Sequence, residues 1–455
     1  MEFTNELFDE LYEFVETKQL KKLREILSEL NPADAALFFD RLEEKNIPIV
    51  FRILPKDLAG ETFSYMDPES QELLIRSFND NELRQIINDM YLDDVVDVIE
   101  EMPANVVARI LQTANQNTRQ QLNELLKYPE DSAGSIMTVE YVSLNKNKTV
   151  AEAFQKIRRE GIDKETVYTC YVTEKRKLIG TVSVKDLLLA DEEESVGNIM
   201  VSNVPAVDAY EDKEEVAKAF SKYDVLALPV VDKDGRIVGI VTVDDAIDVI
   251  EEEATEDIEK IAAITPSDRP YLKSSAASLW LQRIPWLVLL MVSATFTGAI
   301  ITSFEDALQA FPALIAFIPM LMGTGGNAGG QASVTVIRGL ALEEIRMGDV
   351  FKVLWKEIRV SVMCGVVLAV LNFIKIIVVD NLIFGSGITT LENLTVSLTL
   401  VVVVFSAKVI GSTLPIGAKR IGLDPAVMAS PLITTVVDAI SLIVYFAIAT
   451  QVLTI

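Results

Sequence analysis

The sequence predicts a multi-domain membrane protein with four parts: an all-α superhelical N-terminal domain, an α/β tandem pair, a long connecting helix and a five-helix transmembrane bundle. Three observations lead to this fold class. Acidic residues are concentrated before Tyr271, two segments of the middle region repeat one another, and long apolar stretches recur after Tyr271. Because each feature occupies a different part of the 455-residue chain, a single ordinary domain does not account for the sequence.

Charge divides the chain in two. From Tyr271 onward there are ten acidic and eleven basic residues out of totals of 67 and 41, which leaves 57 acidic and 30 basic residues before it. The first part therefore carries about −27 of the net charge of −26, and the second about +1. An acidic region of this size disfavours nucleic acid and favours cations or basic proteins as partners.

The N-terminal domain, residues 1–130, is expected to be helical throughout. Stretches such as "NPADAALFFDRL" and "FNDNELRQIINDM" have Asn near an N-cap position and continue with apolar residues at helical spacing. Stacked helical pairs in a small superhelix would bury those apolar faces. A protein-docking scaffold is also consistent with these repeats.

Residues 131–198 and 199–243 are predicted to be two copies of one α/β unit. "KLIGTVSVKDLLLA" in the first copy corresponds to "RIVGIVTVDDAIDV" in the second, and both predict strand, Asp near a helix N-terminus, then helix. This layout resembles a tandem cystathionine-β-synthase-type (CBS) pair. The resemblance implies a regulatory module, with an adenine nucleotide or an ion as the candidate ligand.

Residues 244–270 are predicted to form an acidic connecting helix. The run "DDAIDVIEEEATEDIE" places nine carboxylates on a helix that leads into the apolar region. A solvated charged face is one interpretation. Cation binding is the other, because like charges at this density repel one another unless cations screen them.

Five apolar stretches within residues 271–455 predict five membrane spans. Each has about the 20 residues needed to cross a bilayer, and they cover 284–304, 311–340, 351–379, 394–416 and 425–453. Basic residues gather in the loops after the second and fourth stretches, among them Arg346, Lys352, Lys419 and Arg420. By the positive-inside rule, we expect a multi-pass protein of the cell membrane with cytoplasmic N-terminal domains and an outside C-terminus.

The second stretch contains the glycine-rich run "GTGGNAGGQ". Gly325, Gly326 and Gly329 are spaced as in closely packed membrane helices. Asn327 and Gln331 add polar groups, and broken backbone at membrane depth is tolerated only inside protein or along a water-filled cavity. We therefore predict a broken helix that lines an aqueous path.

A polar stripe runs along the fifth stretch, which also contains two prolines. It consists of Ser430, Thr434, Asp438, Ser441 and Tyr445. Asp438 follows Asp424 by about 21 Å of helix, well inside the bilayer, where a carboxylate is costly unless it faces water, a cation or a partner. An ion pair with Lys408 is one explanation, and a path for cations is the one we favour.

The whole chain resembles the MgtE family of magnesium channels. The combination of an acidic helical domain, a CBS pair, an acidic connecting helix and spans holding "GTGGNAGGQ" and "DPAVMASPLITTVVD" carries this resemblance. It implies a homodimer in membrane lipid, with a pore at the dimer axis lined by the second and fifth stretches. It also implies Mg²⁺ as both substrate and regulator.

The resemblance assigns roles to individual residues of this sequence. Asp438 matches the pore carboxylate. The residues expected to line the pore are Gly325, Gly326, Asn327, Gly329, Gln331, Ser430, Thr434 and Ser441. The family's magnesium-sensing carboxylates match Glu61, Asp93, Asp97, Asp212, Glu214, Asp224, Asp248, Glu253, Glu256 and Asp257, with Asp424 at the inner pore mouth. Cytosolic magnesium binding there would close the channel. Family members often have Gly-Asn-Gln where this chain has Gly329, Gly330 and Gln331, so one pore amide is missing.

Other function classes fit the sequence less well. A membrane-anchored CBS-type sensor without transport would not need the glycine run or Asp438. A coupled secondary transporter usually has more ionisable groups at membrane depth. An enzyme is not expected, because the sequence contains no His and no nucleophile motif.

Overall fold

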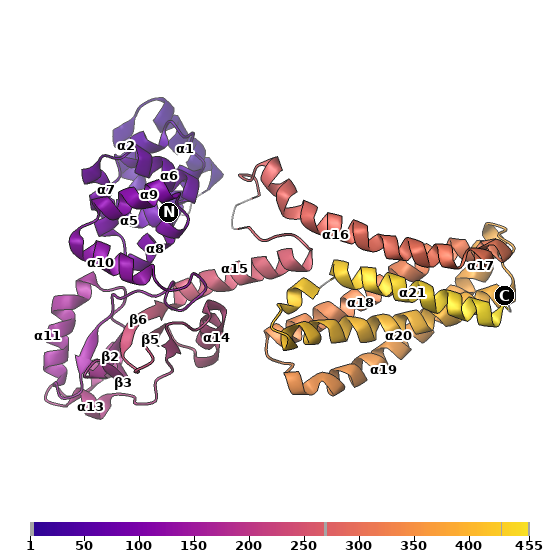
Figure 1. Ribbon diagram of the computed structural model, residues 1–455. Coiled ribbons are helices and arrows are strands. Elements are labelled where there is room, and N and C mark those ends of the chain that lie inside the picture. The colour runs from indigo at the N-terminus through magenta and orange to yellow at the C-terminus, as the bar shows by residue number, and fades with distance from the viewer. Residues whose placement is uncertain (1–3, 268–270, 429, 454–455) are drawn as a thin grey trace. The chain divides into compact units, whose positions relative to one another are not determined.

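The computed structural model of the protein describes residues 4–267, 271–428 and 430–453. The chain divides into two compact units, Met1–Glu251 and Glu252–Ile455 (Figure 1). Each unit is described by itself below.

Short helices make up the first half of the first unit, as predicted. They are α1 (Asn5–Glu16), α2 (Leu20–Leu27), α3 (Pro32–Asp40), α4 (Ile47–Phe51), α5 (Lys56–Ser64), α6 (Pro68–Ser77), α7 (Asp80–Asp89), α8 (Leu92–Glu100), α9 (Ala104–Thr113) and α10 (Gln116–Leu125). The Asn31 side chain caps α3, and Asn79 forms a capping box with Glu82 at the start of α7. These caps satisfy backbone N–H groups that the first helical turn leaves unpaired.

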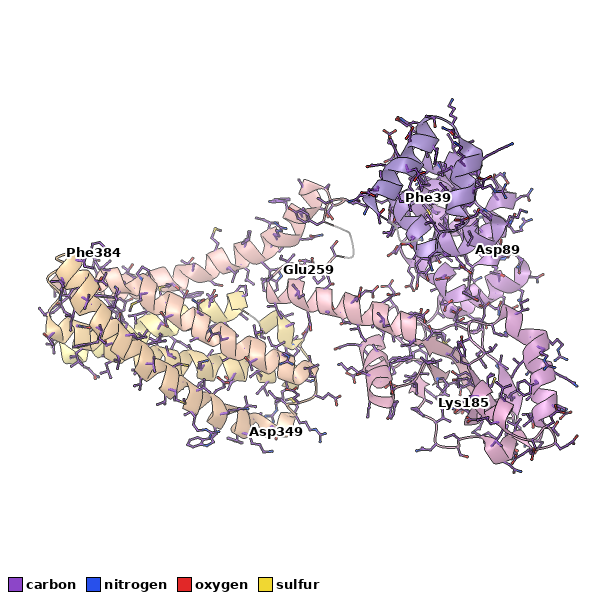
Figure 2. All side chains as sticks on the ribbon, turned by 180° about the vertical axis from the view of Figure 1, so that it is seen from behind. Phe39, Asp89, Lys185, Glu259, Asp349 and Phe384 are labelled. Atoms are coloured by element: carbon purple, nitrogen blue, oxygen red, sulfur yellow. The ribbon has the colours of Figure 1, made fainter. Side chains whose placement is uncertain are left out.

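Aromatic side chains fill the centre of the helical region. Phe39, which Figure 2 labels within these helices, is fully buried, and its ring centroid lies 5.5 Å from that of Phe51. Phe51 in turn lies 5.6 Å from Phe78. Such ring pairs add about 0.5–1.5 kcal/mol each to the burial of their apolar area, so they hold α3, α4 and the end of α6 together.

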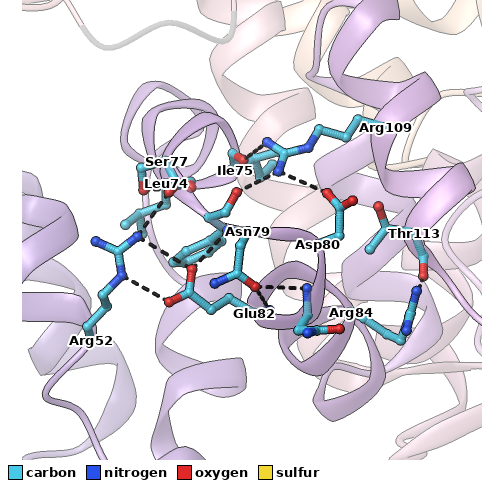
Figure 3. A network of polar contacts seen from close by, with 12 residues as sticks. Arg52, Leu74, Ile75, Ser77, Asn79, Asp80, Glu82, Arg84, Arg109 and Thr113 are labelled. Carbon is cyan, nitrogen blue, oxygen red and sulfur yellow. Dashed lines mark hydrogen bonds and ion pairs between the residues drawn. The ribbon is translucent and has the colours of Figure 1, made fainter.

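Several basic residues of the helical region tie helices to one another (Figure 3). Arg52 Nε donates to Glu82 Oε1 at 3.0 Å, and Arg84 Nε donates to the Thr113 carbonyl at 3.0 Å. Arg109 donates to the Phe78 carbonyl at 2.5 Å. These arginine side chains therefore stabilise the packing of the helices.

The two predicted α/β repeats have the same sheet topology. In the first, β1 (Ser143–Asn145) pairs parallel with β2 (Thr169–Glu174), which pairs antiparallel with β3 (Lys177–Ser183). The second repeats this order with β4 (Val207–Asp208), β5 (Ala227–Val231) and β6 (Ile237–Thr242). The helices are α11 (Val150–Glu160), α12 (Val184–Leu189) and α13 (Val196–Ile199) in the first repeat, and α14 (Lys213–Tyr223) in the second.

One apolar core joins the helical region to the second repeat. It extends from Leu7 through Val95 to Leu228 and Ala246. Ala246 belongs to α15 (Val243–Ile261), which is shorter than the helix predicted over 244–270. The helix ends because Ala263 takes a left-handed conformation, with φ of 55°, and Pro266 follows it.

The second unit is a bundle of long apolar helices. It contains α16 (Ala276–Ser303), α17 (Glu305–Ala310), α18 (Ile318–Ala341), α19 (Val350–Lys375), α20 (Thr390–Arg420) and α21 (Ser430–Val452). A π-helical segment, Ile376–Ile383, continues α19. Asp349 and Phe384, at the two ends of this continuous stretch, lie at opposite ends of the bundle (Figure 2).

Four segments of the described chain are long and apolar enough to cross a membrane. They are Ala276–Ser303, Met347–Ile383, Thr390–Arg420 and Pro425–Val452. The remaining predicted stretch, the second at 311–340, corresponds to a 3₁₀ segment, Pro312–Phe317, followed by α18. Its glycines and polar residues lower its mean hydropathy, so it is not one of these four candidate spans.

The predicted break in the glycine run is wrong. α18 is one continuous helix through Gly323, Gly325, Gly326, Gly329 and Gly330. Glycine in a helix costs roughly 1 kcal/mol relative to alanine. Tight packing against α20 and α21 offsets that cost here, because it buries much of this helix.

Candidate functional site

The polar stripe of the fifth stretch lies on α21. Thr434 Oγ1 donates to the Pro431 carbonyl at 2.8 Å, and the buried Tyr445 hydroxyl donates to the Leu314 carbonyl at 3.0 Å. Ser441 is also buried. Pro431 lies in the first turn of α21, where its missing N–H costs no helical hydrogen bond. Ser430 begins α21, and its side chain lies outside the described part of the chain.

Asp438 is half-buried in the middle of α21. Within the described residues, its carboxylate has no hydrogen bond or ion pair. The Lys408 ammonium, the partner considered from the sequence, instead lies 3.9 Å from Glu357 Oε2 on α19, and both side chains are largely buried. The alternative of a Lys408–Asp438 pair is therefore wrong, and the described part of the chain supplies Asp438 with no cation.

The glycines of α18 bring its backbone against α20 and α21. A Cβ on Gly325 would lie 2.8 Å from Ser441 Oγ, and one on Gly326 would lie 2.9 Å from Thr434 Cγ2. A Cβ on Gly329 would lie 3.0 Å from Ile433 Cγ2. Side chains at these positions would therefore push α18 away from the stripe of α21.

Asn327 and Gln331 point away from this packed face and are exposed on the single chain. Val437 approaches both Gly325 and Gly329 on α18. Asn327 lies between those glycines in sequence, and Asp438 follows Val437, so the amide and the carboxylate lie at the same level of the helix pair. Polar side chains at this depth require water or a polar partner.

A second acidic site lies within the first unit, between the helical region and the CBS pair. We define the acidic cluster as Asp93, Asp94 and Asp97 of α8, Asp245 of α15, and Glu165 in the loop before β2. None of the five forms an ion pair with a basic residue in the described ranges. Two buried oxygens, Asp93 Oδ1 and Glu165 Oε2, have no hydrogen-bond partner there either.

Burial raises the pKa of every member of the acidic cluster, and neighbouring carboxylates raise it further. The pKa is about 7 for Asp93 and Asp245, about 6 for Asp94, about 8 for Asp97 and about 9 for Glu165. After burial, the strongest neighbour of Asp97 is Asp245, and that of Glu165 is Asp93. Of the five side chains only Asp93 is buried, while Asp94, Glu165 and Asp245 are partly exposed and Asp97 is exposed. Carboxylates that repel one another and have no basic partner favour the binding of a cation.

The described carboxylates do not form a finished metal site. No group of three acidic or thiol side chains in these residues converges on one point closely enough to hold an ion. The buried oxygens of Asp93 and Glu165 that lack a hydrogen-bond partner are carboxylate oxygens, the ligand type that a divalent cation takes.

Two members of the acidic cluster, Asp94 and Glu165, were not among the predicted site residues, and Asp245 was noted only as part of the connecting-helix charge. Glu165 is far from α8 in sequence and comes close only through tertiary packing. Asp245 accepts hydrogen bonds from the Thr242 backbone and hydroxyl at the start of α15. Only the adjacency of Asp94 to Asp93 was a usable sequence signal.

The other predicted ligands lie in several places. Glu61 and Asp248 act with Asp94 on the pKa of Tyr65, which burial chiefly raises, so they lie near the cluster. Asp212 caps α14, Glu214 pairs with Lys218 at 2.8 Å, and Asp224 ends α14 in a left-handed conformation. Glu253, Glu256 and Asp257 lie on α15, in the second unit. These residues therefore do not form one group.

Glu256 and Asp424 are joined by a cation of the chain itself. The Lys260 ammonium lies 2.7 Å from Glu256 Oε1 and 2.8 Å from Asp424 Oδ2. These hydrogen bonds raise the pKa of Lys260 even though burial lowers it. Asp424 Oδ1 also accepts from the Ala426 N–H at 2.8 Å, so both of its oxygens are occupied.

Known families match the chain in three places. Residues 9–131 match the MgtE intracellular N domain, residues 133–193 and 196–252 match CBS domains, and residues 318–448 match MgtE, described as a divalent cation transporter. These matches define a multi-pass membrane protein of the divalent cation transporter class with attached helical and CBS domains.

Full-length relatives agree with this class. The chain is 37% identical to the magnesium transporter MgtE of Thermus thermophilus over 444 residues, covering 96% of this chain and 97% of the relative. It is 34% identical to the magnesium transporter MgtE of Bacillus subtilis, covering 95% and 94%. The chain belongs to the MgtE family.

Two solved structures resemble about half of the chain. One is the cytosolic domain of the Mg²⁺ channel MgtE in complex with ATP, with 38% identity and a TM-score of 0.50 over 52% of this chain and 98% of that one. The other is the soluble part of a magnesium transporter, with 30% identity and a TM-score of 0.51 over 55% and 98%.

Proposed function

We propose that this protein carries Mg²⁺ across the cell membrane along a path that Asp438 lines. The observation that carries the proposal is the half-buried carboxylate in the middle of α21, which has no partner among the described residues. Asp438 lies at the same level of the bundle as Gly325 and Gly329, the glycines that bring α18 against α21. Membership of the MgtE family and the magnesium transporters among its relatives support the same ion.

In this proposal α18 is a fifth span. Its 24 residues correspond to about 36 Å of helix, enough to cross the hydrocarbon core. With five spans and basic loops after the second and fourth, the N-terminal domains would be cytoplasmic and the C-terminus would be outside. An odd number of spans puts the two ends of the chain on opposite sides of the membrane.

A second copy of the chain completes the path. Asn327 and Gln331 are exposed on one chain, and facing copies would enclose them in a polar, water-filled space. Two Asp438 side chains would then face one hydrated ion. Mg²⁺ gives up its water reluctantly and keeps several waters when bound, so paired carboxylates attract it without stripping its shell.

Cytosolic magnesium would close this path by binding at the acidic cluster. The orphaned Asp93 and Glu165 oxygens are the first candidates to hold it, with Asp97 and Asp245 beside them. An ion there would stabilise the contact between α8 and the start of α15, the helix that continues toward the membrane unit. Because the ion binds this compact arrangement preferentially, it shifts the population toward it. An adenine nucleotide is the candidate ligand of the CBS pair.

Mg²⁺ uptake into liposomes that contain only this protein tests the transport proposal. A divalent ion held through one water, about 5 Å from a carboxylate, gains roughly 6 kcal/mol at an effective dielectric near 20. Asp438→Asn keeps the shape and removes the charge, so uptake should fall more than about tenfold. Asp380→Asn, which removes a carboxylate paired with Lys375 at 2.7 Å, is the matched control.

Unchanged uptake in the Asp438→Asn variant would contradict the role of this carboxylate. Absence of uptake by the unaltered protein would instead favour the alternative, a membrane-anchored CBS-type sensor that does not transport.

A further inference from the structure

A cavity of about 640 Å³ opens at one end of the membrane unit. It lies between the N-terminal end of α19 and the C-terminal end of α20. Its walls include Met347, Gly348 and Val350 on one side, and Ile416, Lys419 and Arg420 on the other. The basic loops that the sequence places after the second and fourth spans thus meet at one hollow.

The charge at this cavity is positive. Lys419 Nζ donates one hydrogen bond, to the Leu340 carbonyl at 3.3 Å, and Arg420 has no hydrogen bond or ion pair with any residue that the structure describes. Among the described residues that line the cavity, none is a carboxylate. Asp349, which lies between the lining residues Gly348 and Val350, is paired with Lys352 at 2.6 Å and accepts from the Arg346 N–H at 3.2 Å.

Two glycines keep the cavity open. A Cβ on Gly348 or on Gly417 would meet no atom within 4 Å, and neither residue has a positive φ. Neither close packing nor backbone conformation therefore requires glycine at these positions. Both glycines line the cavity, so we expect a larger side chain at either position to reduce its volume.

The end of the bundle at which the cavity lies has the character of a membrane boundary. Phe351 and Trp355, in the first turns of α19, are 85% and 62% exposed, and the Arg359 guanidinium lies 5.9 Å from the Trp355 ring. Exposed tryptophan beside basic residues is typical of the headgroup level of a bilayer. The volume is within the range of roughly 300–1,000 Å³ of small-molecule sites, which is too large for a lone inorganic anion.

We propose that this cavity binds the phosphate-bearing headgroup of an anionic phospholipid through Lys419 and Arg420. The apolar wall of Met347, Val350 and Ile416 suits the glycerol and first acyl carbons, and the positive end of the α19 dipole favours the phosphate. Basic pockets between membrane helices on the cytoplasmic side are suited to such headgroups. This proposal rests on the proposed function only in that the latter puts this end of the bundle on the cytoplasmic side of the membrane.

The test measures lipid retained by the purified full-length protein in detergent, using native mass spectrometry. Phosphatidylglycerol, phosphatidylcholine and inorganic phosphate are titrated in parallel. Each basic residue near an anionic headgroup contributes about a fivefold change in affinity, so Lys419→Gln with Arg420→Gln should weaken phosphatidylglycerol binding about 25-fold. Phosphatidylcholine should bind weakly to the unaltered protein and change little.

A second variant separates the cavity from the charge. Gly417→Leu fills the hollow and leaves both cations, so it too should weaken phosphatidylglycerol binding at least about tenfold by exclusion. Gly298→Leu is its matched control, since Gly298 also has nothing within 4 Å of a Cβ but lies on α16. Lys352→Gln is the charge control at the same end of the bundle, because Lys352 is already paired.

Unaltered phosphatidylglycerol binding in the Gly417→Leu variant would overturn the proposal. Equal competition by inorganic phosphate would also overturn it, because the site would then serve a soluble anion. These results are independent of Mg²⁺ uptake, so failure here leaves the proposed transport untouched.

Discussion

Removal of one carboxyl from the acidic cluster should make the first unit less sensitive to pH when magnesium is absent. Asp93 is 7% exposed, and its pKa is raised from 3.8 to about 7, mainly by burial and then by Asp94. A shift of this size corresponds to about 4 kcal/mol between pH values below 3.8 and well above 7. Asp93→Asn keeps the shape of the side chain and removes this titration.

The sign of the effect follows from the direction of the shift. A carboxyl whose pKa is higher in the folded protein favours folding while it is protonated, and this advantage is lost as the pH rises through about 7. The contribution of Asp93 to the protection of α8 should therefore fall between about pH 4 and pH 7 in the unaltered protein without Mg²⁺. The fall in protection should be shallower in Asp93→Asn.

Magnesium should reverse the trend, because the ion favours the ionised carboxylates. A ligand at 100 times its dissociation constant adds about 2.7 kcal/mol to the stability of the form that it binds. Hydrogen exchange of α8 amides in the full-length protein, corrected for intrinsic rates, measures both effects. Asp9→Asn, an exposed change on α1, is the control.

The reasoning would be refuted if Asp93→Asn had the same pH dependence and the same magnesium response as the unaltered protein. The acidic cluster would then be a solvated surface, and closure would have to depend on other residues. Sodium at equal ionic strength separates specific binding from screening, since screening alone would give protection with either salt.

Two further predictions concern packing in the membrane unit, and thermal unfolding in detergent measures both. Gly411→Ala should destabilise the bundle by about 1–3 kcal/mol, because the new Cβ would overlap the Gly329 carbonyl oxygen. A variant as stable as the unaltered protein would contradict this close approach of α20 to α18. Lys408→Met should destabilise the bundle by about 3–5 kcal/mol, because it leaves Glu357 buried without its cation. Adding Glu357→Gln should restore most of the lost stability. No recovery in the double variant would argue against the Lys408–Glu357 pair.

Features governed by local sequence were predicted well. The caps at Asn31 and Asn79 depend on a few neighbouring residues, and the structure has both. The repeated CBS layout likewise follows from strand and helix periods, and the two sheets share one strand order. Long apolar segments are visible in composition alone, which is why four of the predicted spans stand out by length and apolarity.

Features governed by packing were not predicted. A glycine run suggests a broken helix, yet α18 is continuous because α20 and α21 cover it closely. Lys408 could be paired with Asp438 on charge alone, but the face of α20 that it occupies meets Glu357 of α19. The closeness of Glu165 to Asp93 depends on how the helical region packs on the CBS pair, which no local pattern encodes.

The predicted carboxylates differ in whether the chain already supplies them with a cation. Lys260 lies within 2.8 Å of both Glu256 and Asp424, so an external ion at those residues must displace an ammonium that is already hydrogen-bonded. Asp93 and Glu165 have no such cation in the described part of the chain, and each has a buried oxygen without a partner. Binding an ion at the acidic cluster therefore reduces the repulsion between its carboxylates. Binding one at Glu256 and Asp424 must first break their ion pairs with Lys260. For this reason we expect the cluster to respond at lower magnesium concentrations than the junction of α15 with Asp424.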